Sequence, residues 1–209
     1  MILIIGAMRE ELLEVISHLD NKKELITPFS TYIGKLNEYN VLVCQTGIGK
    51  VNAASALTYL LTNFEIDLVI NLGLAGSVGI QKGLLVTVNK ASFHDFDLTF
   101  FGYEVGEIPK VGKWFSSKAI RNNPFKETVL YTGDKFVSAE LGFSKPYLVD
   151  MEGAALFQVS KMFQKDIVAL KLVSDDLLSK TQDEEYKETE NYSGKYILYE
   201  GLLKLLEVI

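Results

Sequence analysis

The chain has 209 residues, 48% of them hydrophobic and 23% charged, and a formal net charge of −6. This composition predicts one globular domain with a substantial core. The acidic balance argues against a nucleic-acid partner, because phosphate backbones require clustered basic side chains. The apolar runs are too short to span a bilayer, and the first strand begins directly after Met1, so we expect a cytoplasmic protein with no membrane partner.

Cysteine and histidine are scarce in this chain. Cys44 is the single cysteine, so no internal disulfide can form, and its apolar neighbours predict a buried packing role. The two histidines are too far apart to suggest a metal-ligand cluster. We therefore expect no metal and no other cofactor.

Apolar runs alternate with helical periods, which predicts an α/β fold with a central, mixed, twisted sheet flanked by helices. In chain order we expect a strand at 2–6, a helix at 9–19, a meander of strands at 24–33 and 39–45, a helix at 51–63, strands at 68–72, 84–88, 128–131 and 147–149, a helix at 152–163, a strand at 167–173 and a helix at 193–208. Residues 89–127 lack such periodicity, and long irregular segments usually line a site or an interface. Residues 179–191 are polar and acidic, and we expect them to be mobile.

Two acidic residues stand at the ends of elements that otherwise look buried. Glu152 opens the helix that follows D-M at 150–151, and Asp175 ends the run I-V-A-L-K-L-V-S-D at 167–175. An unpaired charge is costly to bury, so acids at such junctions usually face a cleft. Taken alone, the same positions also suit a helix N-cap for Asp175 and a first-turn residue favoured by the helix dipole for Glu152.

Five short segments give the sequence a family resemblance. They are I-I-G-A-M-R-E-E-L at 4–12, T-G-I-G-K-V-N-A-A at 46–54, F-H-D-F-D-L-T-F-F-G-Y-E-V-G-E-I-P at 93–109, T-G-D-K-F-V-S at 132–138, and M-E-G-A-A at 151–155 with V-S-D at 173–175. In this order and spacing the chain resembles the 5′-methylthioadenosine/S-adenosylhomocysteine nucleosidases, and the segment at 93–109 favours them over the nucleoside phosphorylases. The resemblance spans nearly the whole chain and implies a nucleoside phosphorylase-like fold.

The resemblance implies hydrolysis of the N-glycosidic bond of an adenine nucleoside, with release of adenine. Breaking this bond builds positive charge on the ribose and negative charge on the departing base, so an acid must meet the base. Asp175 matches that acid, which protonates adenine N7, and Glu152 matches the carboxylate that accepts hydrogen bonds from the ribose hydroxyls. Glu11 matches the general base that activates the attacking water, whereas the adjacent Glu10 matches no functional position.

Further residues around the substrate follow from the same resemblance. Phe136 matches the aromatic ring that stacks on adenine, Val137 offers its backbone groups to the base edge, and Met151 packs on the sugar. An apolar pocket for the 5′ tail comprises Met8, Ile48, Leu98, Phe101, Tyr103 and Pro109, and the remaining contacts are Ala75, Gly76, Lys171 and Ser174. In the family the 98–109 segment belongs to the neighbouring subunit, which implies a homodimer with shared sites.

Three features depart from the family pattern. Leu74 stands where relatives commonly carry a serine beside the attacking water, Lys171 stands where they carry an arginine with its planar fork, and the region between 109 and 128 is short. Two alternatives therefore stay open. One is a purine nucleoside phosphorylase, for which only Arg9 and Lys171 supply positive charge near the relevant loops; the other is a non-catalytic nucleoside-binding protein. The sequence also leaves open whether the 5′ substituent is methylthio, homocysteinyl, of the futalosine type or, as in 5′-deoxyadenosine, absent.

Overall fold

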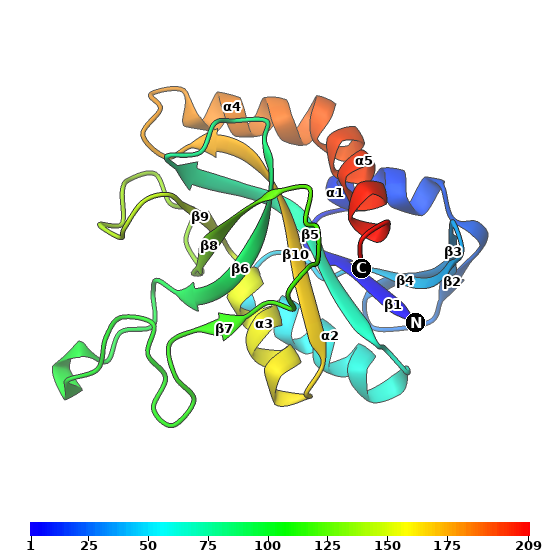
Figure 1. Ribbon diagram of the computed structural model, residues 1–209, viewed down its shortest axis with the longest axis horizontal. Coiled ribbons are helices and arrows are strands. Elements are labelled where there is room, and N and C mark those ends of the chain that lie inside the picture. The colour runs from blue at the N-terminus through cyan, green and yellow to red at the C-terminus, as the bar shows by residue number, and fades with distance from the viewer.

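The computed structural model describes residues 1–209 and has the expected α/β fold, with one large mixed sheet and helices on both of its faces (Figure 1). The strands are β1 (Ile2–Gly6), β2 (Asp20–Leu25), β3 (Ser30–Leu36), β4 (Tyr39–Gln45), β5 (Leu68–Val78), β6 (Leu85–Phe93), β7 (Phe115–Ser116), β8 (Lys126–Thr132), β9 (Tyr147–Asp150) and β10 (Asp166–Asp176). The helices are α1 (Arg9–Ser17), α2 (Lys50–Asn63), α3 (Gly153–Met162), α4 (Gln182–Glu188) and α5 (Gly194–Leu206), with a 3-10 turn, η1 (Thr99–Phe101), and a π-helical turn, η2 (Thr189–Ser193). None of the helices combines the length and the apolar composition needed to cross a bilayer.

Two apolar cores lie on opposite faces of the sheet. In β1, Leu3 and Ile5 join the core beneath α2 and α3, whereas Ile2 and Ile4 join the core beneath α1 and α5. Successive side chains of a strand point to opposite faces, so a continuous apolar run indicates a strand that is covered on both sides. Figure 1 shows α2 and α3 on one side of the sheet and α1, α4 and α5 on the other.

Strand β5 changes partners along its length. On one edge, residues 68–71 pair in parallel with β1 and residues 76–78 pair antiparallel with β9, so residues 72–75 have no strand partner on that edge. The other edge pairs with β10, and β10, β6, β8 and β9 follow side by side until they meet β5 again. Open α/β sheets bind ligands where the strand order is interrupted, and the gap beside residues 72–75 is such a place.

Some elements differ from those that the sequence pattern predicts. β5 continues past Leu72 to Val78 and β10 continues past Val173 to Asp176, because the two strands pair with each other. This pairing extends β5 through Gly73 and Gly76, which would weaken a strand alone. The meander expected at 24–33 and 39–45 is present, but it has three strands, because residues 26–29 form a connection between β2 and β3. The irregular stretch expected at 89–127 holds the end of β6, the turn η1, the two-residue strand β7 and the start of β8.

Candidate active site

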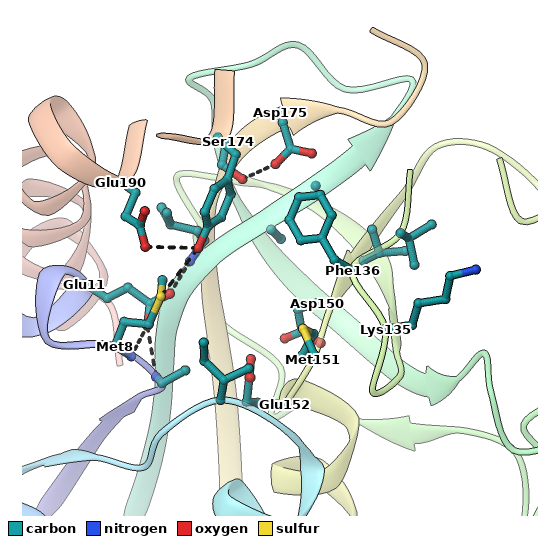
Figure 2. Close-up of a pocket in the computed structure, with 18 of the residues that line it drawn as sticks. Met8, Glu11, Lys135, Phe136, Asp150, Met151, Glu152, Ser174, Asp175 and Glu190 are labelled. Atoms are coloured by element: carbon teal, nitrogen blue, oxygen red, sulfur yellow. Dashed lines mark hydrogen bonds between the residues drawn. The ribbon is translucent and has the colours of Figure 1, made fainter. Parts of the chain in front are cut away.

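A cavity of about 380 Å³ lies beside the unpaired stretch of β5, at the ends of β1, β4, β9 and β10. This volume is typical of a small-molecule site. The lining brings together most of the residues expected at the substrate, namely Met8, Glu11, Ile48, Ala75, Gly76, Phe136, Val137, Met151, Glu152, Ser174 and Asp175. Figure 2 shows Phe136 and Lys135 on one side of the cavity, and Met8, Glu11 and Glu190 across from them.

The Glu11 carboxylate is held by three backbone N–H groups. Its Oε2 atom accepts hydrogen bonds from Ala7 and Met8, both at 2.9 Å, and its Oε1 atom accepts one from Leu74 at 2.8 Å (Figure 2). The bond from Met8 caps the start of α1, whereas the bond from Leu74 uses an N–H that the gap beside β5 leaves free. Burial raises the pKa of Glu11, and the nearby Lys171 ammonium and these N–H groups oppose the rise.

A buried ion pair lies behind the cavity. The Lys171 ammonium is 2.9 Å from Oδ2 of Asp150, and Asp150 also accepts hydrogen bonds from the Thr132 hydroxyl at 2.5 Å and from the Gly153 N–H at 3.0 Å. Burial by itself lowers the pKa of Lys171, but the surrounding carboxylates, Asp150 first, raise it overall, so the ammonium stays charged. Lys171 does not line the cavity, in contrast to the substrate contact expected for it. It is instead the counter-charge that makes several buried carboxylates tolerable.

Glu152 precedes the first turn of α3 and faces the cavity. It caps no N–H of its own helix, and its Oε1 atom accepts a hydrogen bond from the Gly49 N–H at 2.7 Å. Gly153 follows because a Cβ there would collide with Leu130 and with the Asp150 carboxylate, so the close approach of α3 to β8 and β9 requires glycine. Burial, and next the Asp150 carboxylate, raise the pKa of Glu152 to about 8.

We expect Glu152→Gln to stabilise the unliganded protein at alkaline pH. The folded pKa of about 8 lies above the ordinary value of 4.5, so ionisation of this buried group removes stability as the pH rises through that window. The neutral amide avoids this loss and keeps an oxygen for the Gly49 N–H. Melting curves should therefore show the variant gaining on the parent by several degrees between about pH 5 and about pH 8.5. A difference in Tm that does not change with pH would contradict the expectation.

Asp175 is aimed into the cavity by an irregularity in β10. The pairing with β5 shifts register between Val173 and Asp175, and as a result Ser174 and Asp175 both line the cavity, although neighbours in a regular strand face opposite ways. The Ser174 hydroxyl donates to Oδ1 at 2.5 Å, and the Gln182 side-chain amide donates to Oδ2 at 2.8 Å. Burial raises the pKa of Asp175, and these two hydrogen bonds oppose the rise. The carboxyl group therefore keeps its proton to a higher pH than an exposed aspartate does.

Residues 179–191, expected to be mobile, hold α4 and most of η2, which cover one side of the cavity. Gln182, Tyr186 and Glu190 line the cavity from this segment. Gln182 also donates to the Val137 carbonyl at 2.8 Å, so one amide group joins Asp175 to the backbone of Val137, the residue expected at the base edge. The three side chains are spaced four residues apart, which is one helix face. This four-residue spacing is the signal in the sequence that could have placed Gln182, Tyr186 and Glu190 at the site. The charged residues between them hide it, because they make the whole segment look exposed.

Comparison with known proteins shows the family of this chain. Its residues 1–196 match the family model of the phosphorylase superfamily. A 5′-methylthioadenosine/S-adenosylhomocysteine nucleosidase of Anoxybacillus flavithermus is 34% identical over 196 residues, which cover 83% of this chain and 84% of that protein. This chain belongs to that nucleosidase family.

Solved nucleosidase structures share the fold of this chain. The nucleosidase from S. pneumoniae, with the transition-state inhibitor MT-ImmA, matches with a TM-score of 0.88 at 29% identity, over 99% of this chain and 98% of that one. The nucleosidase from Colwellia psychrerythraea 34H, in complex with adenine, matches with a TM-score of 0.89 at 28% identity, over 99% and 94% of the two chains. The match to the fold therefore extends over the elements that form the cavity.

Leu74, which stands where the resemblance implies a serine, lies between the cavity and the core. Its side chain belongs to the core beneath α1 and α5 and lies close to Gly194, at the start of α5. Only its backbone N–H reaches the Glu11 carboxylate. The hydrogen bond to Glu11 is therefore independent of the side chain at position 74. Leu74 has no hydroxyl group to offer to the attacking water that the resemblance implies.

The 98–109 segment of the nucleosidase lies away from its own cavity. Leu98, Phe101, Tyr103 and Pro109, all expected in the tail pocket, are not among the residues that line it. The turn η1 instead projects from the body of the molecule (Figure 1), with Phe100 92% exposed and Phe101 69% exposed. Within one chain, the tail end of the cavity is thus formed by Met8, Ile48 and the covering segment.

Proposed function

We propose that this nucleosidase hydrolyses the N-glycosidic bond of 5′-methylthioadenosine, S-adenosylhomocysteine or both, and releases adenine. The observation that carries the proposal is the environment of Asp175, a buried carboxyl group with a raised pKa. Gln182 joins it to the backbone of Val137, and Phe136 stands next along the chain with its ring in the cavity lining. An acid beside an aromatic ring suits a purine that must be protonated as it leaves.

Asp175 acts on the base in the proposed step. Its proton passes to N7 of adenine while the bond between C1′ and N9 breaks, and the bond electrons remain on the base. Adenine therefore departs neutral instead of as an anion, and positive charge develops on the ribose ring. Phe136 meets Tyr186 edge-on at 5.5 Å between ring centres, which leaves an aromatic face for the base.

Glu152 and Glu11 act on the sugar. Oε1 of Glu152 is occupied by the Gly49 N–H, so Oε2 is available to accept hydrogen bonds from the ribose hydroxyls. Oε1 of Glu11 accepts only the Leu74 N–H, so it retains a lone pair for a water molecule. As the water oxygen bonds to C1′, Glu11 takes its proton, which balances the proton that Asp175 released. Negative charge on the Glu11 carboxylate near the ribose also favours the cationic transition state.

A phosphorylase is less well supported, because phosphate requires cations that can reach it. Lys171 is engaged by Asp150 behind the cavity, and Arg9 is exposed and outside the lining. Lys135 does line the cavity, but it lies on the Phe136 side, across from Glu11 and Met8 (Figure 2). The deciding measurement is adenine release from 5′-methylthioadenosine with and without phosphate. A rate independent of phosphate supports the hydrolase, and a ribose 1-phosphate product overturns it. Tight binding without release indicates a nucleoside-binding protein.

We also propose a homodimer in which the 98–109 segment completes the neighbour's cavity. The support is the apolar exposure of η1 together with a tail pocket to which a single chain contributes only part of the expected residues. Exposed apolar patches of this kind usually mark a contact surface. The neighbour's aromatic side chains would then close the pocket over the 5′ tail.

The dimer predicts two results. Light scattering should give twice the chain mass of 23.4 kDa, and Tyr103→Ala should raise KM more than it lowers kcat, because Tyr103 contacts only the tail. Tyr196→Ala, at an exposed aromatic residue of α5, is the matched control and should change neither. A fully active monomer is incompatible with the proposal.

A further inference from the structure

The cavity contains a carboxylate that has no cationic partner. Glu190 lines the cavity across from Phe136 (Figure 2), and its side chain accepts one hydrogen bond, from the Tyr186 hydroxyl at 3.3 Å. No lysine, arginine or histidine forms an ion pair with it. Two acids of the same segment behave differently, since Asp183 and Glu188 pair with lysines outside the cavity.

Tyr186 relates Glu190 to the 5′ end of the substrate. The Tyr186 hydroxyl lies 3.5 Å from the Met8 sulfur and 3.3 Å from Oε1 of Glu190, so a single hydroxyl group separates the two. Met8 stands where the 5′ tail begins in the proposed binding mode. A tail that extends past Met8 therefore comes within reach of the Glu190 carboxylate, whereas a methylthio group ends before it.

The charges at this end of the cavity favour a cation. Asp150 is paired with Lys171, and the proposed binding mode places Asp175 at the base and Glu152 at the ribose hydroxyls. Glu11 and Glu190 remain as the acidic groups on the Met8 side of the cavity (Figure 2). An ammonium group beside a carboxylate makes a short, charge-assisted hydrogen bond, and a cavity wall of one sign concentrates the opposite charge. The carboxylate would meet such a group without displacing an existing cation.

We propose that Glu190 selects 5′-thioadenosines whose tail carries a primary ammonium group, such as the homocysteinyl tail, over those with a short uncharged tail. The inference rests on the proposed function and names the substrate class within it. Glu190 acts on specificity alone, because the reacting bond lies at the ribose, beyond Met8 and Glu11.

A matched pair of substrates isolates the ammonium group. 5′-Propylthioadenosine and 5′-(3-aminopropyl)thioadenosine differ only in that group, and the ratio of their kcat/KM values measures the preference. We expect the parent to prefer the ammonium compound and Glu190→Gln to reduce that preference by about tenfold, as loss of a charge-assisted bond should. Glu188→Gln, on the outer face of the same segment, should keep the parent's preference. S-adenosylhomocysteine carries a carboxylate on its tail in addition to the ammonium group. Its kcat/KM relative to that of 5′-propylthioadenosine should also fall in Glu190→Gln.

Two results overturn the inference: no preference in the parent, or the same preference in parent and Glu190→Gln. 5′-Methylthioadenosine in the same assay is the reference for the proposed function, because its failure to release adenine would reject the hydrolase and not the tail site. If no adenine is released, the shift in Tm produced by 5′-propylthioadenosine and by 5′-(3-aminopropyl)thioadenosine still reports which tail binds more tightly. Equal shifts would then overturn the inference as well.

Discussion

Replacing Asp175 by asparagine should lower kcat for adenine release by on the order of a hundredfold or more, with little loss of fold. The amide keeps the shape of the carboxyl group, its oxygen can still accept from the Gln182 amide, and its NH₂ group can donate to the Ser174 hydroxyl oxygen. It has no proton to give to the base. The parent should lose activity as the pH rises through the raised pKa of Asp175, and the variant should lack that limb of the profile.

The matched control for Asp175 is its neighbour. Asp176→Asn keeps the oxygen that accepts the Leu178 N–H at 3.0 Å, and Asp176 does not line the cavity. Its kcat should stay within a few-fold of the parent. Comparable losses at both positions would mean that the register shift in β10 does not select Asp175 as the acid.

Glu11→Gln should lower kcat at least as far as Asp175→Asn does, and it should also destabilise the protein. Only one oxygen of an amide can accept, so at least one of the three N–H groups now bound to the carboxylate would face an NH₂ group. A buried donor without an acceptor costs roughly 1–3 kcal/mol. The free energy of unfolding should fall by about that amount. The variant also cannot take a proton from water at neutral pH, so activity should be lost well below its Tm.

Glu10 provides the comparison for Glu11. It is exposed on the outer face of the same helical turn and makes no hydrogen bond through its side chain in this structure. Glu10→Gln should therefore be nearly silent in both chemical denaturation and adenine release. Equal effects of the two substitutions would show that the general base lies elsewhere.

The sequence predicts best those features that local segments determine. Glu11, Glu152 and Asp175 each stand where a strand ends or a helix begins, and the ends of several strands meet at one cavity, so the pattern of apolar runs already indicates that these acids lie together. The Asp150–Lys171 pair could not be predicted in this way, because it depends on how β9 and β10 flank β5.

Other differences have equally physical causes. The extension of β5 past its glycines depends on pairing with β10, which no window of the sequence contains. The covering segment is rich in acidic residues, which predicts mobility, yet its inward face packs through Gln182 and Tyr186.

The ring formed by β5, β10, β6, β8 and β9 leaves β2 as the long strand whose outer edge is free. That edge reads D-N-K-K-E-L, it is exposed along nearly its whole length, and its pairing with β3 slips between Asp20 and Lys23. Charged side chains and broken register discourage another strand from adding to an edge. Two copies therefore cannot readily join by extending their sheets, and the chain is protected against strand-by-strand aggregation. Variants that disturb the cavity should consequently fail by losing activity or unfolding reversibly, before they form β-rich aggregates.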